Sequence, residues 1–107
     1  MDHLQTLKKI LDIAIKENAS DVLISVNHPP VVRITGQLVP LAKEKNITAP
    51  EAEGLAFAIL SDERKKKFLT DKEIDFSYDH DGKARFRVNI FFQRESISMA
   101  LRLISVH

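Results

Sequence analysis

The first segment of the chain carries apolar residues at helical spacing. Between Asp2 and Asn18 they fall three or four positions apart, which predicts a helix with one buried face. Asp2 can cap the first turn with Gln5 three positions later, and Asn18 can end the helix in the left-handed conformation. The apolar stripe consists of Leu4, Leu7, Ile10, Leu11, Ala14 and Ile15.

A second helical segment begins at Thr48. Thr48 is a suitable N-cap, Pro50 suits the first turn, and Glu51 can reach back to complete a capping box. Ser61 then starts a short further helix that we expect to run through Phe68, with its acidic residues at the front and its lysines at the back. The residues of the second segment expected to face the core are Leu55, Ala56, Ile59 and Leu60.

Short apolar runs between these helices predict strands. Residues 22–26 and 31–35 are rich in β-branched side chains, and Gly36 turns the second run into a third at residues 37–41. Pro40 has no backbone donor, so we expect it at a strand end or in an edge strand.

The last third of the chain largely alternates between apolar and polar residues. This period of two predicts three strands, and Asp81-Gly82 is a typical hairpin turn between the first two. We therefore predict an α+β fold, in which helices cover one face of a mainly antiparallel sheet. The apolar positions are Ile74, Phe76 and Tyr78, then Phe86, Val88, Ile90 and Phe92, then Ile97, Met99, Leu101 and Leu103.

The register of the last hairpin can be predicted, because a slip of one residue would turn every apolar side chain to solvent. Closing it at Arg94-Glu95 pairs each inward apolar residue with another. The pairs are Phe92 with Ile97, Ile90 with Met99, Val88 with Leu101, and Phe86 with Leu103. The same register sets Arg87 opposite Arg102 on the outward face, where like charges are destabilising. We expect an acidic group to neutralise them.

Two groups could neutralise these arginines, and the sequence does not decide between them. A three-residue loop at residues 80–82, with Gly82 in the left-handed conformation, would set Asp75 opposite Arg87 as an ion pair. The alternative is an anion supplied by a ligand or another domain and held between the two guanidinium groups. The two arrangements can coexist.

Composition excludes several classes of protein. The 107 residues suit a single domain, and 44% hydrophobic content excludes intrinsic disorder. A net charge of +1 argues against a dedicated duplex nucleic-acid binder, and the absence of cysteine excludes disulfides and thiolate catalysis. Three glycines leave no phosphate-binding loop of the Walker or dinucleotide type. The apolar runs are too short to span a bilayer, and we expect no signal peptide.

Other polar groups carry weaker functional indications. Ser20 and Asp21 suggest turn and capping chemistry rather than a catalytic triad. The basic run at residues 64–67 is typical of a solvated helix face, with contact to acidic protein or lipid headgroups as the alternative. Only Phe91 shares the outward face with the arginines, which is too few aromatics for an RNA platform. A solvated strand face explains the acidic residues Asp71, Glu73, Asp75, Asp79 and Asp81, and the scattered histidines predict no metal site.

Five segments occur in an order that resembles a known family. They are ASDVLI at 19–24, PPVVRITGQL at 29–38, EIDFSY at 73–78, RFRVNIF at 85–91 and LRLI at 101–104. Together they resemble the N-terminal domain of the type IV pilus retraction (twitching-motility) ATPases, within the secretion-ATPase superfamily. The resemblance extends over nearly the whole chain.

This resemblance implies that residues 1–107 form a PAS-like domain, which in the family precedes a RecA-like ATPase domain carrying the Walker motifs. It also implies a cytoplasmic homo-hexamer at the inner-membrane base of the pilus machinery. ATP and magnesium would lie between the two domains, and hydrolysis would drive motion of the hexamer. By motif, Arg87 and Arg102 match the family arginines that reach the phosphates. We then expect this chain to be a fragment, inactive alone, without a catalytic residue, metal or cofactor of its own.

Three positions depart from the family pattern. Leu23 stands where the family often has histidine, and His28 and Glu95 stand where it commonly has glycine. These departures leave open an assembly ATPase or a paralogue rather than a retraction motor. The alternative from another functional class is a stand-alone PAS-like module for ligand sensing or protein interaction.

Overall fold

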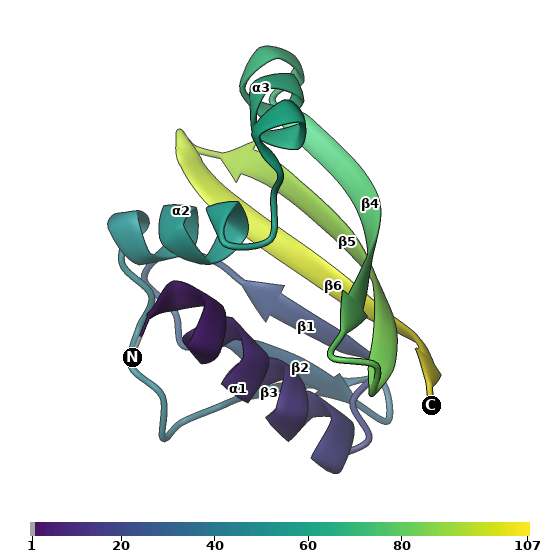
Figure 1. Ribbon diagram of the computed structural model, residues 1–107. Coiled ribbons are helices and arrows are strands. Elements are labelled where there is room, and N and C mark those ends of the chain that lie inside the picture. The colour runs from purple at the N-terminus through teal and green to yellow at the C-terminus, as the bar shows by residue number, and fades with distance from the viewer. Residues whose placement is uncertain (1) are drawn as a thin grey trace.

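The computed structural model describes residues 2–107, which form one six-stranded antiparallel sheet and three helices. The strand order across the sheet is β3-β2-β1-β6-β5-β4. Helices α1 and α2 cover one face, and α3 lies at the end of the sheet beside β4 and β5 (Figure 1). The predicted α+β class is confirmed. The elements are α1 (His3–Lys16), β1 (Asp21–Ile24), β2 (Val31–Ile34), β3 (Gln37–Pro40), α2 (Ala49–Phe57), α3 (Asp62–Asp71), β4 (Glu73–His80), β5 (Ala84–Gln93) and β6 (Ser96–Val106).

Both predicted ends of α1 and the predicted start of α2 are confirmed, whereas α2 ends at Phe57, before Ile59 and Leu60. The Asp2 carboxylate accepts the backbone N–H of Gln5 at 2.8 Å, and Asn18 follows α1 with a φ of 57°. At α2 the Thr48 hydroxyl accepts the Glu51 N–H at 3.2 Å, while the Glu51 carboxylate accepts the Thr48 N–H at 3.0 Å. Each reciprocal bond satisfies a donor that the helix itself leaves unpaired.

Helix α3 is longer than the sequence predicts. It continues past the buried Phe68 to Asp71, and Lys72 ends it in the left-handed conformation with a φ of 66°. Its last turn carries no basic residue, so the expectation of lysines at the back of this helix is wrong. Phe68 holds this helix against the sheet, because its ring stacks on Phe92 of β5 with 4.9 Å between centroids.

The β5–β6 register is confirmed at every predicted pair. Val88 lies opposite Leu101, Ile90 opposite Met99, and Arg87 opposite Arg102. The apolar side of these strands forms the core with α1 and α2. The largest fully buried apolar side chains are Phe68, Phe86, Leu7, Ile10, Leu11, Ile24, Leu55, Ile90, Met99 and Leu101.

The β4–β5 register differs from the prediction by two residues. His80 is not in the loop but ends β4 opposite Ala84, so that Ser77, and not Asp75, lies opposite Arg87. His80 is fully buried, and its Nε2 lies 2.7 Å from an Asp12 carboxylate oxygen on α1. This partner makes it possible to bury a polar side chain at the end of the strand, which lengthens the hairpin.

Strand β1 joins the two halves of the chain. It pairs with β2 on one side and with β6 on the other, with Val22 opposite Leu101. Strand β3 lies at one edge of the sheet and contains Pro40, as expected for a residue without a backbone donor. Within residues 2–107 no helix has the length and hydropathy that a membrane crossing requires.

Candidate functional site

Arg87 and Arg102 lie side by side on the face of the sheet that the helices leave uncovered. They are direct cross-strand partners on β5 and β6, as predicted. Their side chains are 68% and 74% exposed, respectively. Two guanidinium groups in this arrangement repel each other unless carboxylates or an external anion compensate them.

Asp75 compensates Arg87 as an ion pair. The Arg87 Nε donates to Asp75 Oδ1 at 3.0 Å and its Nη2 donates to Oδ2 at 3.3 Å. The predicted pair is therefore confirmed, although the predicted register is wrong. The contact is diagonal, because Asp75 lies opposite Asn89 and reaches toward Arg87 two positions along β5.

Asp21 compensates Arg102, a partner that the sequence analysis missed. Asp21 and Arg102 are cross-strand partners on β1 and β6, and the Arg102 Nε donates to Asp21 Oδ1 at 3.0 Å. The second carboxylate oxygen accepts the Ser20 hydroxyl at 2.7 Å and lies 3.5 Å from the Arg33 Nε of β2. The expectation of turn and capping chemistry at Ser20 and Asp21 is wrong, because Asp21 is the first residue of a central strand.

The environment of Asp21 favours its charged form. Its carboxylate is only 13% exposed, and burial raises its pKa. The Ser20 hydroxyl and the Arg102 guanidinium outweigh that effect, and the net pKa of Asp21 lies below its usual value. Asp21 therefore stays ionised at neutral pH and holds Arg102 in place.

A row of charges thus crosses five neighbouring strands. In sheet order it runs Arg33 on β2, Asp21 on β1, Arg102 on β6, Arg87 on β5 and Asp75 on β4. Arg102 uses only its Nε toward Asp21, and Arg87 uses its Nε and Nη2 toward Asp75. The remaining guanidinium N–H groups make no hydrogen bond to any residue in 2–107. They can bind an oxyanion without first breaking either ion pair.

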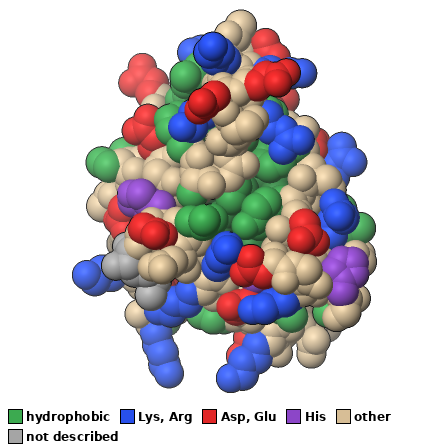
Figure 2. Space-filling model, in the orientation of Figure 1, with side chains coloured by type: hydrophobic (Ala, Val, Ile, Leu, Met, Phe, Trp, Pro, Cys, Tyr) green, Lys and Arg blue, Asp and Glu red, His purple; other side chains and the backbone are tan. Residues whose placement is uncertain are grey.

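The other charged groups predicted from sequence do not converge on one site. Arg64 lies over the Phe76 ring at 4.8 Å, and Lys65 lies over the Phe57 ring at 5.4 Å. Figure 2 shows the helix-covered face, where basic and acidic side chains are interspersed around an apolar centre. Among residues 2–107, no three His, Asp or Glu side chains are grouped as metal ligands.

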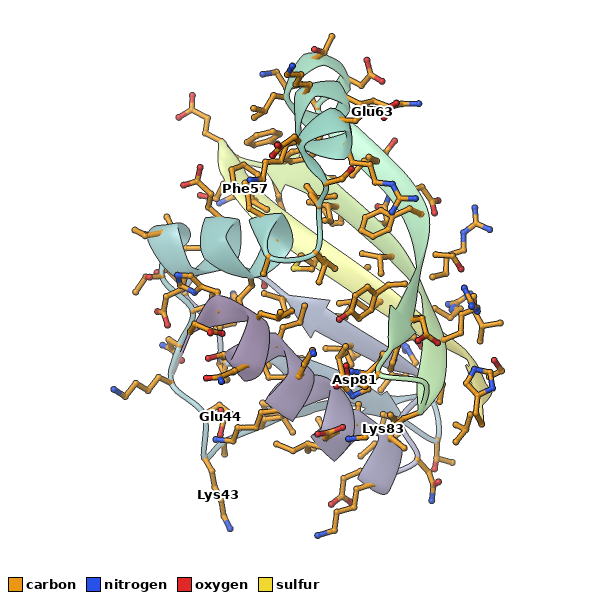
Figure 3. The ribbon with its side chains drawn as sticks, viewed as in Figure 1. Lys43, Glu44, Phe57, Glu63, Asp81 and Lys83 are labelled. Atoms are coloured by element: carbon orange, nitrogen blue, oxygen red, sulfur yellow. The ribbon has the colours of Figure 1, made fainter. Side chains whose placement is uncertain are left out.

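A second charged cluster, also missed from sequence, joins α1 to the β4–β5 turn. Lys8 contacts Asp81 at 2.9 Å, and Asp12 contacts His80 at 2.7 Å and Lys83 at 3.2 Å. The labelled Asp81 and Lys83 lie at the hairpin end beside α1 (Figure 3). The hydrogen bond with His80 and then that with Lys83 hold the pKa of Asp12 below its usual value, against the opposing effect of partial burial.

Comparison with known proteins finds relatives in sequence and in fold. No known protein-family profile matches the chain. It is 25% identical over 100 residues to the type IV pilus ATPase PilU of Pseudomonas aeruginosa, covering 94% of this chain and 26% of PilU. It is 32% identical over 102 residues to the pilus retraction ATPase PilT of the same organism, covering 92% of this chain and 28% of PilT. A crystal structure of the retraction motor PilT with bound ADP superposes with a TM-score of 0.86 at 32% identity, covering 94% of this chain and 29% of that one.

The chain is homologous, over nearly its whole length, to part of the pilus ATPases PilU and PilT. The Legionella pneumophila ATPase DotB shares the fold, with a TM-score of 0.75 at 22% identity over 98% of this chain and 30% of DotB. This pilus-ATPase homologue spans between a quarter and a third of the length of the curated relatives that it matches. The resemblance noted from the five sequence segments is confirmed.

Proposed function

We propose that this chain is the N-terminal domain of a type IV pilus or related secretion motor and that its charged sheet face completes the motor's ATP site. The observation that carries the proposal is the opposed pair Arg87 and Arg102, each with N–H groups directed to solvent and each held by a different carboxylate. The homologous PilT structure contains bound ADP, which supports a nucleotide as the anion.

In this proposal the two arginines bind phosphate oxygens of ATP, and a separate ATPase domain supplies the phosphate loop and the magnesium ion. Guanidinium groups suit this task because they remain charged and donate in a planar fork. An arginine supplied from outside the phosphate-loop domain contributes roughly 10³–10⁵ in turnover in some phosphoryl-transfer enzymes. Because Arg87 and Arg102 share positioning with charge stabilisation, we expect a smaller loss of roughly 10- to 1000-fold for each.

The same proposal assigns the assembly. The motor is a cytoplasmic homo-hexamer, peripheral to the inner membrane at the base of the pilus machinery. The domain couples hydrolysis to twitching motility by moving with the nucleotide. With no phosphate loop in residues 1–107, the domain alone turns over no ATP.

The test is ATPase turnover of the full-length protein carrying Arg87→Ala or Arg102→Ala. Arg85→Ala is the matched control, because Arg85 is an exposed residue on the same strand and the same face as Arg87. We expect both test variants to lose activity while the control and all three melting temperatures stay close to wild type. Wild-type turnover in both test variants would refute the nucleotide role.

A further inference from the structure

A polar cavity of about 450 Å³ lies at the end of the sheet where β1 stops and β5 turns into β6. The last residue of β1, Ile24, pairs with Met99 of β6, close to the β5–β6 turn. The cavity shares the uncovered sheet face with the arginine pair but lies apart from it. Ser98 on its wall is four residues from Arg102 along β6, which corresponds to about 13 Å of strand. The lining residues are Ser25, Val26, Asn27, His28, Gln93, Arg94, Ser96 and Ser98.

The chemistry of this lining favours an anion. Seven of the eight residues are polar, and none of these described lining residues is acidic. Arg94 contributes a permanent positive charge, and the imidazole ring of His28 contributes an N–H group that can donate a hydrogen bond. The Ser98 side chain is held in a fixed position in the cavity wall. The residue is 4% exposed, and its hydroxyl donates to the Gln93 side chain at 3.3 Å.

Three residues in the loops that form the cavity have an unfavourable backbone conformation. Asn27, Arg94 and Glu95 have φ values of 71°, 52° and 69°, in the left-handed region that non-glycine residues rarely adopt. An arginine and a glutamate at the centre of a tight hairpin replace the Asn-Gly type of sequence that this geometry favours. Arg94 lines this cavity, whereas Glu95 lines a separate hollow with Phe57 and Leu69 on the helix side.

Arg94 is a free cation within the described chain. It makes no ion pair with any residue in 2–107, in contrast to Arg33, Arg87 and Arg102 on the same sheet face. A strained turn that places an unpaired arginine at the wall of a cavity without acidic lining residues is a costly arrangement if it serves stability alone. It is the arrangement that binding of an oxyanion requires.

We propose that this cavity binds a small organic phosphate or carboxylate. Arg94 and His28 hold the anionic group, and the hydroxyls of Ser25 and Ser96 complete its coordination. The cavity is larger than an inorganic phosphate ion and falls within the usual size of small-molecule sites, so it also holds an uncharged part of the ligand. The site is distinct from the nucleotide face, because a single anionic group cannot reach both Arg94 and Arg102.

The experiment is a titration of the 15N-labelled domain with sodium phosphate and, separately, with sodium acetate, at matched ionic strength with sodium chloride. The two probes distinguish a phosphate ligand from a carboxylate ligand. We expect saturable amide shifts at Asn27, Arg94, Ser96 and Ser98 with at least one probe. Arg94→Ala weakens that binding by about tenfold or more, and Arg64→Ala on α3 leaves it unchanged.

Arg94→Gly is the second test variant, since glycine removes the side chain and also relieves the left-handed strain, so the turn still folds. Shifts at these amides that do not saturate, or that persist unchanged in both Arg94 variants, overturn the proposal. Shifts confined to Arg87 and Arg102 also overturn it while leaving the nucleotide proposal standing. The ATPase assay on the arginine pair can fail without affecting this result, so the two proposals are tested separately.

Discussion

Arg87 and Arg102 are direct cross-strand neighbours, yet each guanidinium binds a carboxylate on the strand that lies on its own outer side, away from the other arginine. Asp75 on β4 holds Arg87, and Asp21 on β1 holds Arg102. The two carboxylates therefore lie on the outer sides of the arginine pair, and within residues 2–107 no carboxylate forms an ion pair with both arginines. A positive potential between two such arginines is the physical basis of the proposed binding of an anion.

A compensating substitution tests the relationship between Asp75 and Arg87. Arg87→Ala frees the Asp75 carboxylate beside the proposed phosphate position, where it repels the nucleotide. We expect Asp75→Asn to restore part of the ATPase activity lost in full-length Arg87→Ala, because it removes that repulsion. We expect Arg87→Lys to rescue poorly, since lysine keeps the charge but loses the forked geometry. Equal activity of the single and double variants would show that Asp75 does not act on the nucleotide.

The free energy of unfolding should fall in acid, in part because the Asp21 carboxylate becomes protonated. Its pKa in the folded domain lies below its usual value, because the Ser20 hydroxyl and Arg102 outweigh the effect of burial. A lowered folded pKa contributes stability that is fully present above the unfolded pKa of about 3.9 and is lost as the pH falls through the folded pKa. Urea unfolding between about pH 6 and pH 2.5 should therefore show a declining free energy of unfolding, with a shallower decline in Asp21→Asn.

The matched control for that measurement is Asp62→Asn, because the Asp62 side chain at the start of α3 is 98% exposed. It should leave the acid decline unchanged. At neutral pH we expect Asp21→Asn to cost roughly 1 kcal/mol, through the weakened bonds from Ser20 and Arg102. Identical acid profiles of wild type and Asp21→Asn would contradict the assignment of this carboxylate as a charged anchor.

Leu101 on β6 is a central residue of the hydrophobic core. Its side chain is fully buried between β1 and β5, opposite Val22 and Val88. Leu101→Ala should cost about 2–4 kcal/mol, from lost burial and the cavity left behind. Leu38→Ala is the control, because Leu38 on the edge strand β3 is 52% exposed and should change the free energy of unfolding by less than about 0.5 kcal/mol. Urea denaturation followed by circular dichroism measures both.

A glycine in the β5–β6 turn should stabilise the domain. Glu95 is exposed and has a φ of 69°, which costs roughly 1–2 kcal/mol for a residue with a Cβ. Glu95→Gly should therefore raise the free energy of unfolding by about 1 kcal/mol, after allowing for the greater freedom of glycine in the unfolded chain. Gly82→Ala in the β4–β5 turn, at a φ of 71°, is the reciprocal control and should lower it. A destabilised Glu95→Gly would mean that the Glu95 side chain makes a compensating contact.

Structural features that depend on residues close together in the chain could be predicted from the sequence, and those that depend on distant residues could not. The β5–β6 register was predictable because apolar residues on both strands restrict one short hairpin to one alignment. The β4–β5 register was not, because burial of His80 depends on Asp12, a residue on a helix far away in the chain. The partner of Arg102 was missed for the same reason, since the pairing of β1 with β6 has no local pattern that indicates it.

The long-range pairing of β1 with β6 also determines the order in which this domain can fold. Strand β1 contributes to the centre of the sheet, but its partner is the last strand of the chain, with Asp21 opposite Arg102. A nascent chain therefore cannot complete the sheet until β6 has left the ribosome, and until then β1 lacks one of its two neighbouring strands. Contacts this distant in sequence slow folding and prolong the interval in which apolar strands are open to aggregation.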